Sequence, residues 1–120
     1  MPNAFVHHEL NTTDPEKARS FYGQLFDWTM EDMPMGDMGT YTVIKVDGKG
    51  VGGLMKHPVP GAPSMWLNYV SVDDIRASTD KAKALGATIL QDSIDIPNIG
   101  IFSILSDPTG AVIALFQPKM

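Results

Sequence analysis

Two stretches of the chain, sixty residues apart, follow the same pattern and indicate an internal repeat. Asp47–Met55 and Asp107–Leu115 each begin with Asp, carry Gly three residues later and continue as an apolar run. Asp and Gly favour turns, and a short apolar run beside turn residues favours a strand, so each stretch is predicted to lead from a turn into a buried strand. Asp14 and Asp74 match at the same spacing. We therefore predict two similar halves in which residue n corresponds to residue n+60, within a residue or two of slippage, and in which Asp47 and Asp107 occupy like turns.

The spacing of apolar residues predicts a strand, a helix and three further strands in each half. In the first half we expect strands at 4–11, 28–33, 41–46 and 51–56, with a helix from the Asp14 cap to about residue 26. In the second half we expect strands at 65–72, 88–91, 101–105 and 111–116, with a helix between Asp74 and Gly86. The predicted fold class is α+β: two βαβββ repeats form a curved mixed sheet with a concave cavity and helices on its outer face. The repeats cover about residues 3–56 and 65–117 of a single domain, 1–120, and a proline-rich linker, 57–64, joins them.

Helical spacing places Ala18, Phe21, Tyr22 and Leu25 on one apolar stripe of the first helix. We expect this stripe to face the sheet. The residues predicted to be buried are Phe21, Leu25, Val70, Ile104 and Leu115.

The composition narrows the range of partners. The 120 residues carry a formal net charge of -5, whereas nucleic acids and anionic membranes are bound by basic patches. The sequence has no apolar run long enough to span a membrane, and it has no cysteine for disulfides, thiolate zinc sites or a cysteine nucleophile. We therefore expect a cytoplasmic protein that binds neither nucleic acid nor membrane.

Several short motifs occur in a characteristic order along the chain. They are His8-Glu9-Leu10, Thr13-Asp14, Ala18-Arg19-Ser20-Phe21-Tyr22, Val72-Asp73-Asp74, Ala84-Leu85-Gly86-Ala87 and Asp107-Pro108-Thr109-Gly110-Ala111. Their order and spacing, which span the whole chain, resemble the vicinal oxygen chelate superfamily of glyoxalases, bleomycin-resistance proteins and extradiol dioxygenases. The resemblance implies the fold predicted above, and for a chain of this size it also implies a homodimer.

Metal-dependent members of that superfamily use four ligands, usually His and Glu, from the first and last strand of each half. The resemblance places these positions at His7, Leu54 (or Gly53, one residue away), Leu67 and Ala114. Leucine and alanine have no donor atoms, and one imidazole does not hold a divalent ion with useful affinity. We therefore predict the superfamily's scaffold with no metal and no cofactor.

Strand alternation selects the polar candidates near these positions. His7 and Glu9 face the predicted cavity, where they could act as base and proton donor, hold a polar ligand, or form a hydrogen-bonded pair at the strand end. His8 faces the helix in this register and is expected to be structural, and His57 is expected to be solvated in the linker. The catalytic candidates are His7 and Glu9. The candidate ligand-binding residues are His7, Glu9, Leu54, Leu67, Tyr69 and Ala114, and a flat ligand could stack on Tyr69, Trp28, Tyr41 or Phe102.

Three classes of function fit this pattern. The missing donors favour a glyoxalase- or bleomycin-resistance-like protein that binds a small organic molecule in the cavity without a metal. One alternative is a lyase, isomerase or dioxygenase-type enzyme, similar to lactoylglutathione lyase, that uses His7 and Glu9. The other is an interaction module with a vestigial cavity. The residues alone do not decide whether the chain is catalytic.

Overall fold

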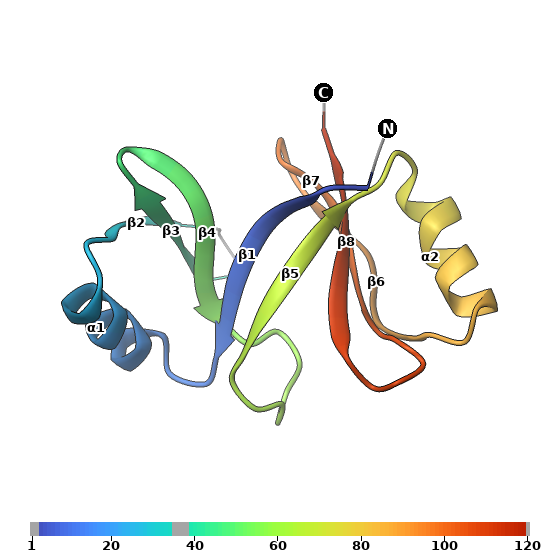
Figure 1. Cartoon of the computed structure of the whole chain (residues 1–120), viewed down its shortest axis with the longest axis horizontal. Helices are drawn as coiled ribbons and strands as arrows, with labels where there is room; N and C mark the ends of the chain where they lie inside the picture. The colour runs from blue at the N-terminus through green and yellow to red at the C-terminus, as the bar shows by residue number, and fades with distance from the viewer. Residues whose placement is uncertain (1–2, 35–38, 120) are drawn as a thin grey trace. The chain divides into compact units, whose positions relative to one another are not determined.

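The computed structural model describes residues 3–34 and 39–119 of the chain (Figure 1). Its elements follow in the order β1 (Phe5–Thr12), α1 (Pro15–Leu25), β2 (Thr29–Pro34), β3 (Thr40–Val46), β4 (Lys49–Lys56), β5 (Met65–Ser71), α2 (Ile75–Ala84), β6 (Thr88–Ile96), β7 (Gly100–Ser106) and β8 (Val112–Pro118). The predicted α+β class and the two βαβββ repeats are confirmed. His7–Trp66 form one compact unit, called the first unit, and the residues on either side of it form the second unit. None of the described helices is long and apolar enough to cross a membrane.

The first unit is a four-stranded sheet with α1 on one face. Its strand order is β2-β3-β4-β1, in which β1 and β4 run parallel and the other neighbours run antiparallel. The helix begins at Pro15 because the Asp14 carboxylate accepts a hydrogen bond from the Lys17 backbone N–H at 3.1 Å. Between helix and sheet lies a core of Leu10, Ile44 and Leu54, against which Ala18, Tyr22 and Trp28 pack.

The stripe of α1 that faces the sheet is narrower than predicted. Ala18 and Tyr22, four residues apart, reach the core, whereas Phe21 is 58% exposed and Leu25 is 56% exposed. The prediction that Phe21 and Leu25 are buried is therefore wrong. The ring of Tyr22 on α1 packs against other aromatic rings: it stacks on Trp28 and meets Trp66 edge to face.

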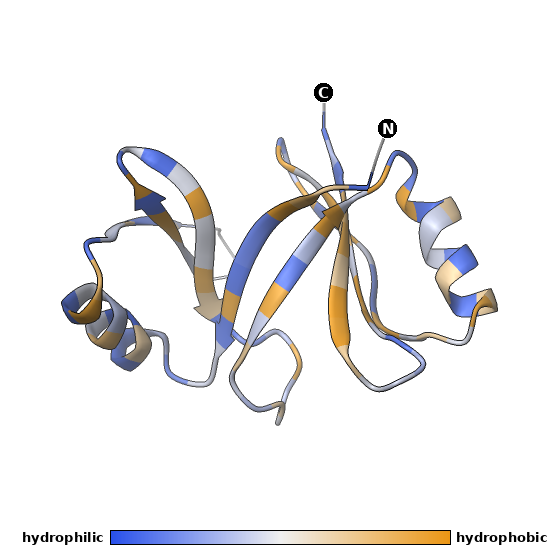
Figure 2. Cartoon of the chain, viewed as in Figure 1, coloured by the Kyte–Doolittle hydropathy of each residue, from blue (hydrophilic) through white to orange (hydrophobic). Residues whose placement is uncertain are grey.

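The second unit repeats this plan with the strand order β5-β8-β7-β6, in which β5 and β8 run parallel. Asp74 caps α2, and Ile75 and Thr79 are the buried residues of that helix. Most of β8 is hydrophobic (Figure 2), as expected for a strand inside a sheet. Ile104 is buried as predicted, whereas Val70 and Leu115 are half-buried.

The strand predicted at 88–91 continues to Ile96. Its pairing with β7 shifts register twice, between Ile89 and Gln91 and between Gln91 and Ile94. Ser93 has a φ of 49° in the second irregularity. An irregular ladder of this kind breaks the simple alternation that sequence patterns detect.

The offset between corresponding residues of the two halves is not sixty everywhere. Asp14 and Asp74 occupy the same cap at that offset. Glu9, however, pairs with Gly53, while Tyr69 pairs with Ala114, so β4 corresponds to β8 with an offset of sixty-one residues. This shift of one residue lies within the slippage of a residue or two that the prediction of two similar halves allowed.

The prediction that Asp47 and Asp107 occupy like turns is wrong. Asp47 and Gly48, with φ of 52° and 80°, form a two-residue hairpin turn between β3 and β4. Pro108 cannot adopt a positive φ, so the loop between β7 and β8 is longer. There the Asp107 carboxylate accepts hydrogen bonds from the backbone N–H groups of Thr109 and Ala111.

Candidate functional site

The sheet of the first unit has a face opposite α1, which we call the His7 face. Leu10 and Leu54 belong to the core beneath α1, so their neighbours along each strand point to the other side. Glu9 pairs with Gly53, and Gly53 pairs with Val43, so these three residues lie in one row across the His7 face. Because side chains alternate, His7 lies on the same face of β1 and Tyr41 on the same face of β3.

Three side chains on this face form one hydrogen-bonded group, which we call the Tyr41 cluster. The Nε2 atom of His7 lies 2.6 Å from the hydroxyl oxygen of Tyr41, and Tyr41 also bonds to the carboxylate of Glu9. Glu9 is only 4% exposed, and His7 and Tyr41 are half-buried. The cluster is thus a buried carboxylate connected through a phenol to an imidazole.

Electrostatics fix the direction of the hydrogen bonds in the Tyr41 cluster. Burial raises the pKa of Tyr41 far above its usual value, and the charge and hydrogen bond of Glu9 raise it further. Tyr41 therefore keeps its single proton and donates it to Glu9, so its oxygen is left to accept from the N–H of His7 Nε2. Burial, together with the neighbouring His8, lowers the pKa of His7 and keeps the imidazole neutral near pH 7.

Gly53 provides the space that the Tyr41 ring occupies. A Cβ atom built on Gly53 would overlap the hydroxyl oxygen and Cζ of Tyr41. Of the two positions that the sequence left open for the second superfamily ligand, Gly53 is on the His7 face and Leu54 is in the core on the other side. The sequence pattern indicates Tyr41 only as a surface on which a flat ligand could stack. The available signal for the Tyr41 contact is the pair Gly52-Gly53 within β4, because a glycine inside a strand often marks a place where another group approaches the backbone closely.

The other sequence candidates belong to the second unit. Leu67, Tyr69 and Ala114 are 2%, 6% and 0% exposed. Tyr69 pairs with Ala114, and its ring meets Phe102 and Phe116 edge to face. They form an apolar sheet face within that unit.

The donor atoms do not fit the superfamily's metal site. Gly53, Leu67 and Ala114 have no donor side chains, and the donors on the His7 face of β1 are His7, Glu9 and the amide of Asn11. Within residues 3–34 and 39–119, no group of three or more His, Asp or Glu side chains could hold a metal ion. His8 is exposed, while His57, expected to be solvated, is half-buried with its Nε2 atom fully buried.

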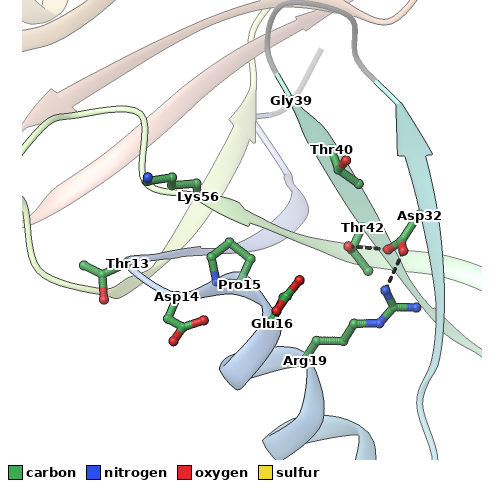
Figure 3. A pocket seen from close by; sticks show the side chains of 10 residues that line it. All are labelled: Thr13, Asp14, Pro15, Glu16, Arg19, Asp32, Gly39, Thr40, Thr42 and Lys56. Carbon is green, nitrogen blue, oxygen red and sulfur yellow. Dashed lines mark hydrogen bonds and ion pairs between the residues drawn. The ribbon is translucent and has the colours of Figure 1, made fainter.

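A cavity of about 680 Å³ lies on the other side of the first unit, beside the start of α1 (Figure 3). Asp32 accepts hydrogen bonds there from Thr42 and Arg19, and these two bonds lower the pKa of its carboxyl group. None of the catalytic or ligand-binding candidates selected from the sequence lines this cavity. The lining residues are Thr13, Asp14, Pro15, Glu16, Arg19, Asp32, Gly39, Thr40, Thr42 and Lys56.

This fold, with its repeated units, agrees with the comparison to known families. Residues 4–115 match the family model described as the glyoxalase/bleomycin resistance protein/dioxygenase superfamily, and the chain belongs to that superfamily. The chain is 37% identical over 113 residues to "Putative glyoxylase CFP32" of Mycobacterium tuberculosis, covering 94% of this chain and 43% of the relative. It is 26% identical to "Anthracycline biosynthesis protein DnrV" of Streptomyces peucetius, covering 97% of this chain and 47% of the relative. The chain therefore spans less than half the length of these relatives.

Solved structures show the same fold. Methylmalonyl-CoA epimerase from Mycobacterium tuberculosis has a TM-score of 0.66 at 14% identity, covering 97% of this chain and 88% of that chain. A Mn(II)-bound glyoxalase from Novosphingobium aromaticivorans has a TM-score of 0.57 at 14% identity, covering 97% of this chain and 40% of that chain. At these identities the similarity concerns the fold and not the activity.

Proposed function

We propose that this chain binds a small organic molecule on the His7 face without a metal ion. The Tyr41 cluster carries the proposal, because it puts a buried carboxylate and two polar rings at the superfamily's first ligand strand. A ligand with a hydroxyl or carbonyl group can exchange hydrogen bonds with these side chains while its apolar part covers Val43, which lies in the same row as Glu9. The positions that would complete a metal site offer glycine, leucine and alanine instead.

A second candidate is proton-transfer chemistry of the lyase or isomerase type. Glu9 favours it, since a carboxylate that is 4% exposed and bonded to a phenol resembles the general bases of enzymes that act on carbonyl compounds. In this second candidate Glu9 takes a proton from the substrate and then no longer accepts the hydrogen bond of Tyr41. Tyr41, which stays protonated, can then donate its hydrogen bond to the developing oxyanion. The relative named as a glyoxylase is consistent with such chemistry.

Calorimetry and a thermal-shift screen test the binding proposal. The probes are a hydroxyanthraquinone, chosen because one relative is named for anthracycline biosynthesis, and hydroxybenzaldehyde. Tyr41→Phe and Glu9→Gln are expected to weaken binding about tenfold each, since each removes a hydrogen bond to a buried group. Glu16→Gln is the matched control, because Glu16 is an exposed carboxylate in the first turn of α1, on the opposite side of the sheet.

The same samples test the absence of a metal. Elemental analysis is expected to find no stoichiometric zinc, nickel, iron or manganese, and a chelator should change neither the melting temperature nor ligand binding. One tightly held metal per chain that is lost in His7→Ala would overturn the proposal and favour a metal-dependent enzyme. Formation of lactoylglutathione that depends on Glu9 would instead support the second candidate.

We also propose that the chain forms a homodimer through the apolar side chains that α1 and its surroundings leave exposed. Phe21 and Leu25 are more than half exposed, and Phe26 and Trp66 are 43% and 41% exposed. Exposed apolar patches of this kind usually mark an interaction site. Light scattering is expected to give the mass of a dimer for the wild type and of a monomer for Phe21→Gln/Leu25→Gln. A dimer that persists in this variant would exclude the α1 surface as the interface.

A further inference from the structure

Asn11 on β1 carries a buried polar atom that the fold leaves without a partner. The side chain is 2% exposed, and its Oδ1 atom has no hydrogen-bond partner in the part of the chain that the structure describes. An acceptor kept in this state costs free energy, so buried polar atoms normally have partners. Because Leu10 faces α1, Asn11 points to the His7 face, in line with Glu9.

His57, directly after β4, carries a second such atom of the opposite kind. Its Nδ1 atom accepts a hydrogen bond from the Val59 backbone N–H at 3.0 Å. The neutral ring therefore has its proton on Nε2, and this buried N–H has no partner among the described residues. Burial lowers the pKa of His57, which favours this neutral form.

The strand register places the two residues on one side of the sheet. Asn11 pairs with Met55, and the backbone N–H of His57 continues the ladder by donating to the Thr12 carbonyl at 3.0 Å. His57 therefore lies on the same side as Met55 and Asn11, with about 8 Å between the Cα positions of Asn11 and His57. One acceptor and one donor thus belong to residues on the same side of the sheet, at the end of the His7 face.

We propose that Asn11 Oδ1 and His57 Nε2 form a specificity subsite for a hydroxyl group of the bound molecule. A hydroxyl accepts from the His57 N–H and donates to Asn11, whereas an ether or ketone oxygen leaves Asn11 unpaired. The subsite rests on the proposed function and extends it. It assigns the ligand to hydroxylated compounds whose hydroxyl lies beyond the group that contacts the Tyr41 cluster.

Phenol and anisole test the subsite, because they share a ring and differ in whether the oxygen carries a proton. Phenol is expected to bind the wild type about tenfold more tightly than anisole, as the loss of one hydrogen bond to a buried group predicts. Phenol should also shift the His57 Nε2 signal in a ¹⁵N NMR titration, assigned with His57→Phe. In Asn11→Leu and His57→Phe the preference should disappear. In Asn11→Leu the melting temperature should stay or rise, since an unpaired buried acceptor is removed.

Three results would overturn the subsite. They are equal binding or no binding of phenol and anisole, an unmoved His57 signal, and a lowered melting temperature of Asn11→Leu, which would mean that Asn11 only supports the fold. The proposed function is decided separately by Tyr41→Phe. If that variant weakens binding of hydroxybenzaldehyde while Asn11→Leu changes nothing, the subsite fails and the proposed function stands. If neither variant affects any probe, both fail.

Discussion

Leu54→Ala is expected to lower the free energy of unfolding by about 2–5 kcal/mol, whereas Leu25→Ala should cost less than about 1 kcal/mol. Leu54 is 1% exposed and lies in the core between β4 and α1, so truncation leaves a cavity and removes apolar contacts. Leu25 is 56% exposed near the end of the same helix, and alanine favours helices slightly more than leucine.

Chemical denaturation of the two variants measures both losses, with Leu10→Ala as a second core position. Equal losses for Leu25 and Leu54 would mean that α1 buries the wider stripe that helical spacing alone predicts. A loss below about 1 kcal/mol for both Leu54 and Leu10 would contradict the core described above.

Local chemistry made most of the fold predictable from the sequence. Asp14 and Asp74 start the two helices because each carboxylate accepts a hydrogen bond from the backbone N–H three residues later. This interaction is local, so it can be predicted without knowing the rest of the fold. The Asp47-Gly48 turn is equally local, since both residues tolerate a positive φ. Element order and the α+β class follow from such signals.

Side-chain surroundings were less predictable because they depend on residues distant in sequence. Leu25 lies on the apolar stripe of α1, but it is 56% exposed, while Tyr22 of the same helix packs against Trp28 and Trp66. The offset of sixty-one residues between β4 and β8 moves one superfamily position from Leu54 to Gly53, and one residue is enough to change the face of a strand.

The Tyr41 cluster could be predicted only in part. Alternation placed His7 and Glu9 on one face, but their link through Tyr41 joins strands that are more than thirty residues apart in sequence. The partnerless atoms of Asn11 and His57 were not predictable, since sequence patterns indicate where a side chain points and not which partners it lacks.

Gly53→Ala is expected to cost about 2–4 kcal/mol of stability and to abolish ligand binding on the His7 face. The new Cβ atom would occupy the position of the Tyr41 hydroxyl and Cζ, so the ring must leave and Glu9 and His7 lose the partner between them. Gly50→Ala is the matched control on the same strand, because its Cβ would meet only Val43 Cγ1 at an ordinary 3.4 Å.

The position of the Tyr41 ring over Gly53 is tested by repeating Gly53→Ala in two backgrounds. In Tyr41→Phe the penalty should persist, because Cζ and Cε2 of the ring still overlap the new Cβ atom. In Tyr41→Ala the ring is absent and Gly53→Ala should cost less than about 0.5 kcal/mol, which gives a coupling energy of about 2 kcal/mol or more between the two positions. Chemical denaturation of the three single and two double variants beside the wild type provides the two cycles. A penalty that is unchanged in Tyr41→Ala would mean that Gly53 is required by the backbone alone, and Tyr41 would no longer explain the glycine.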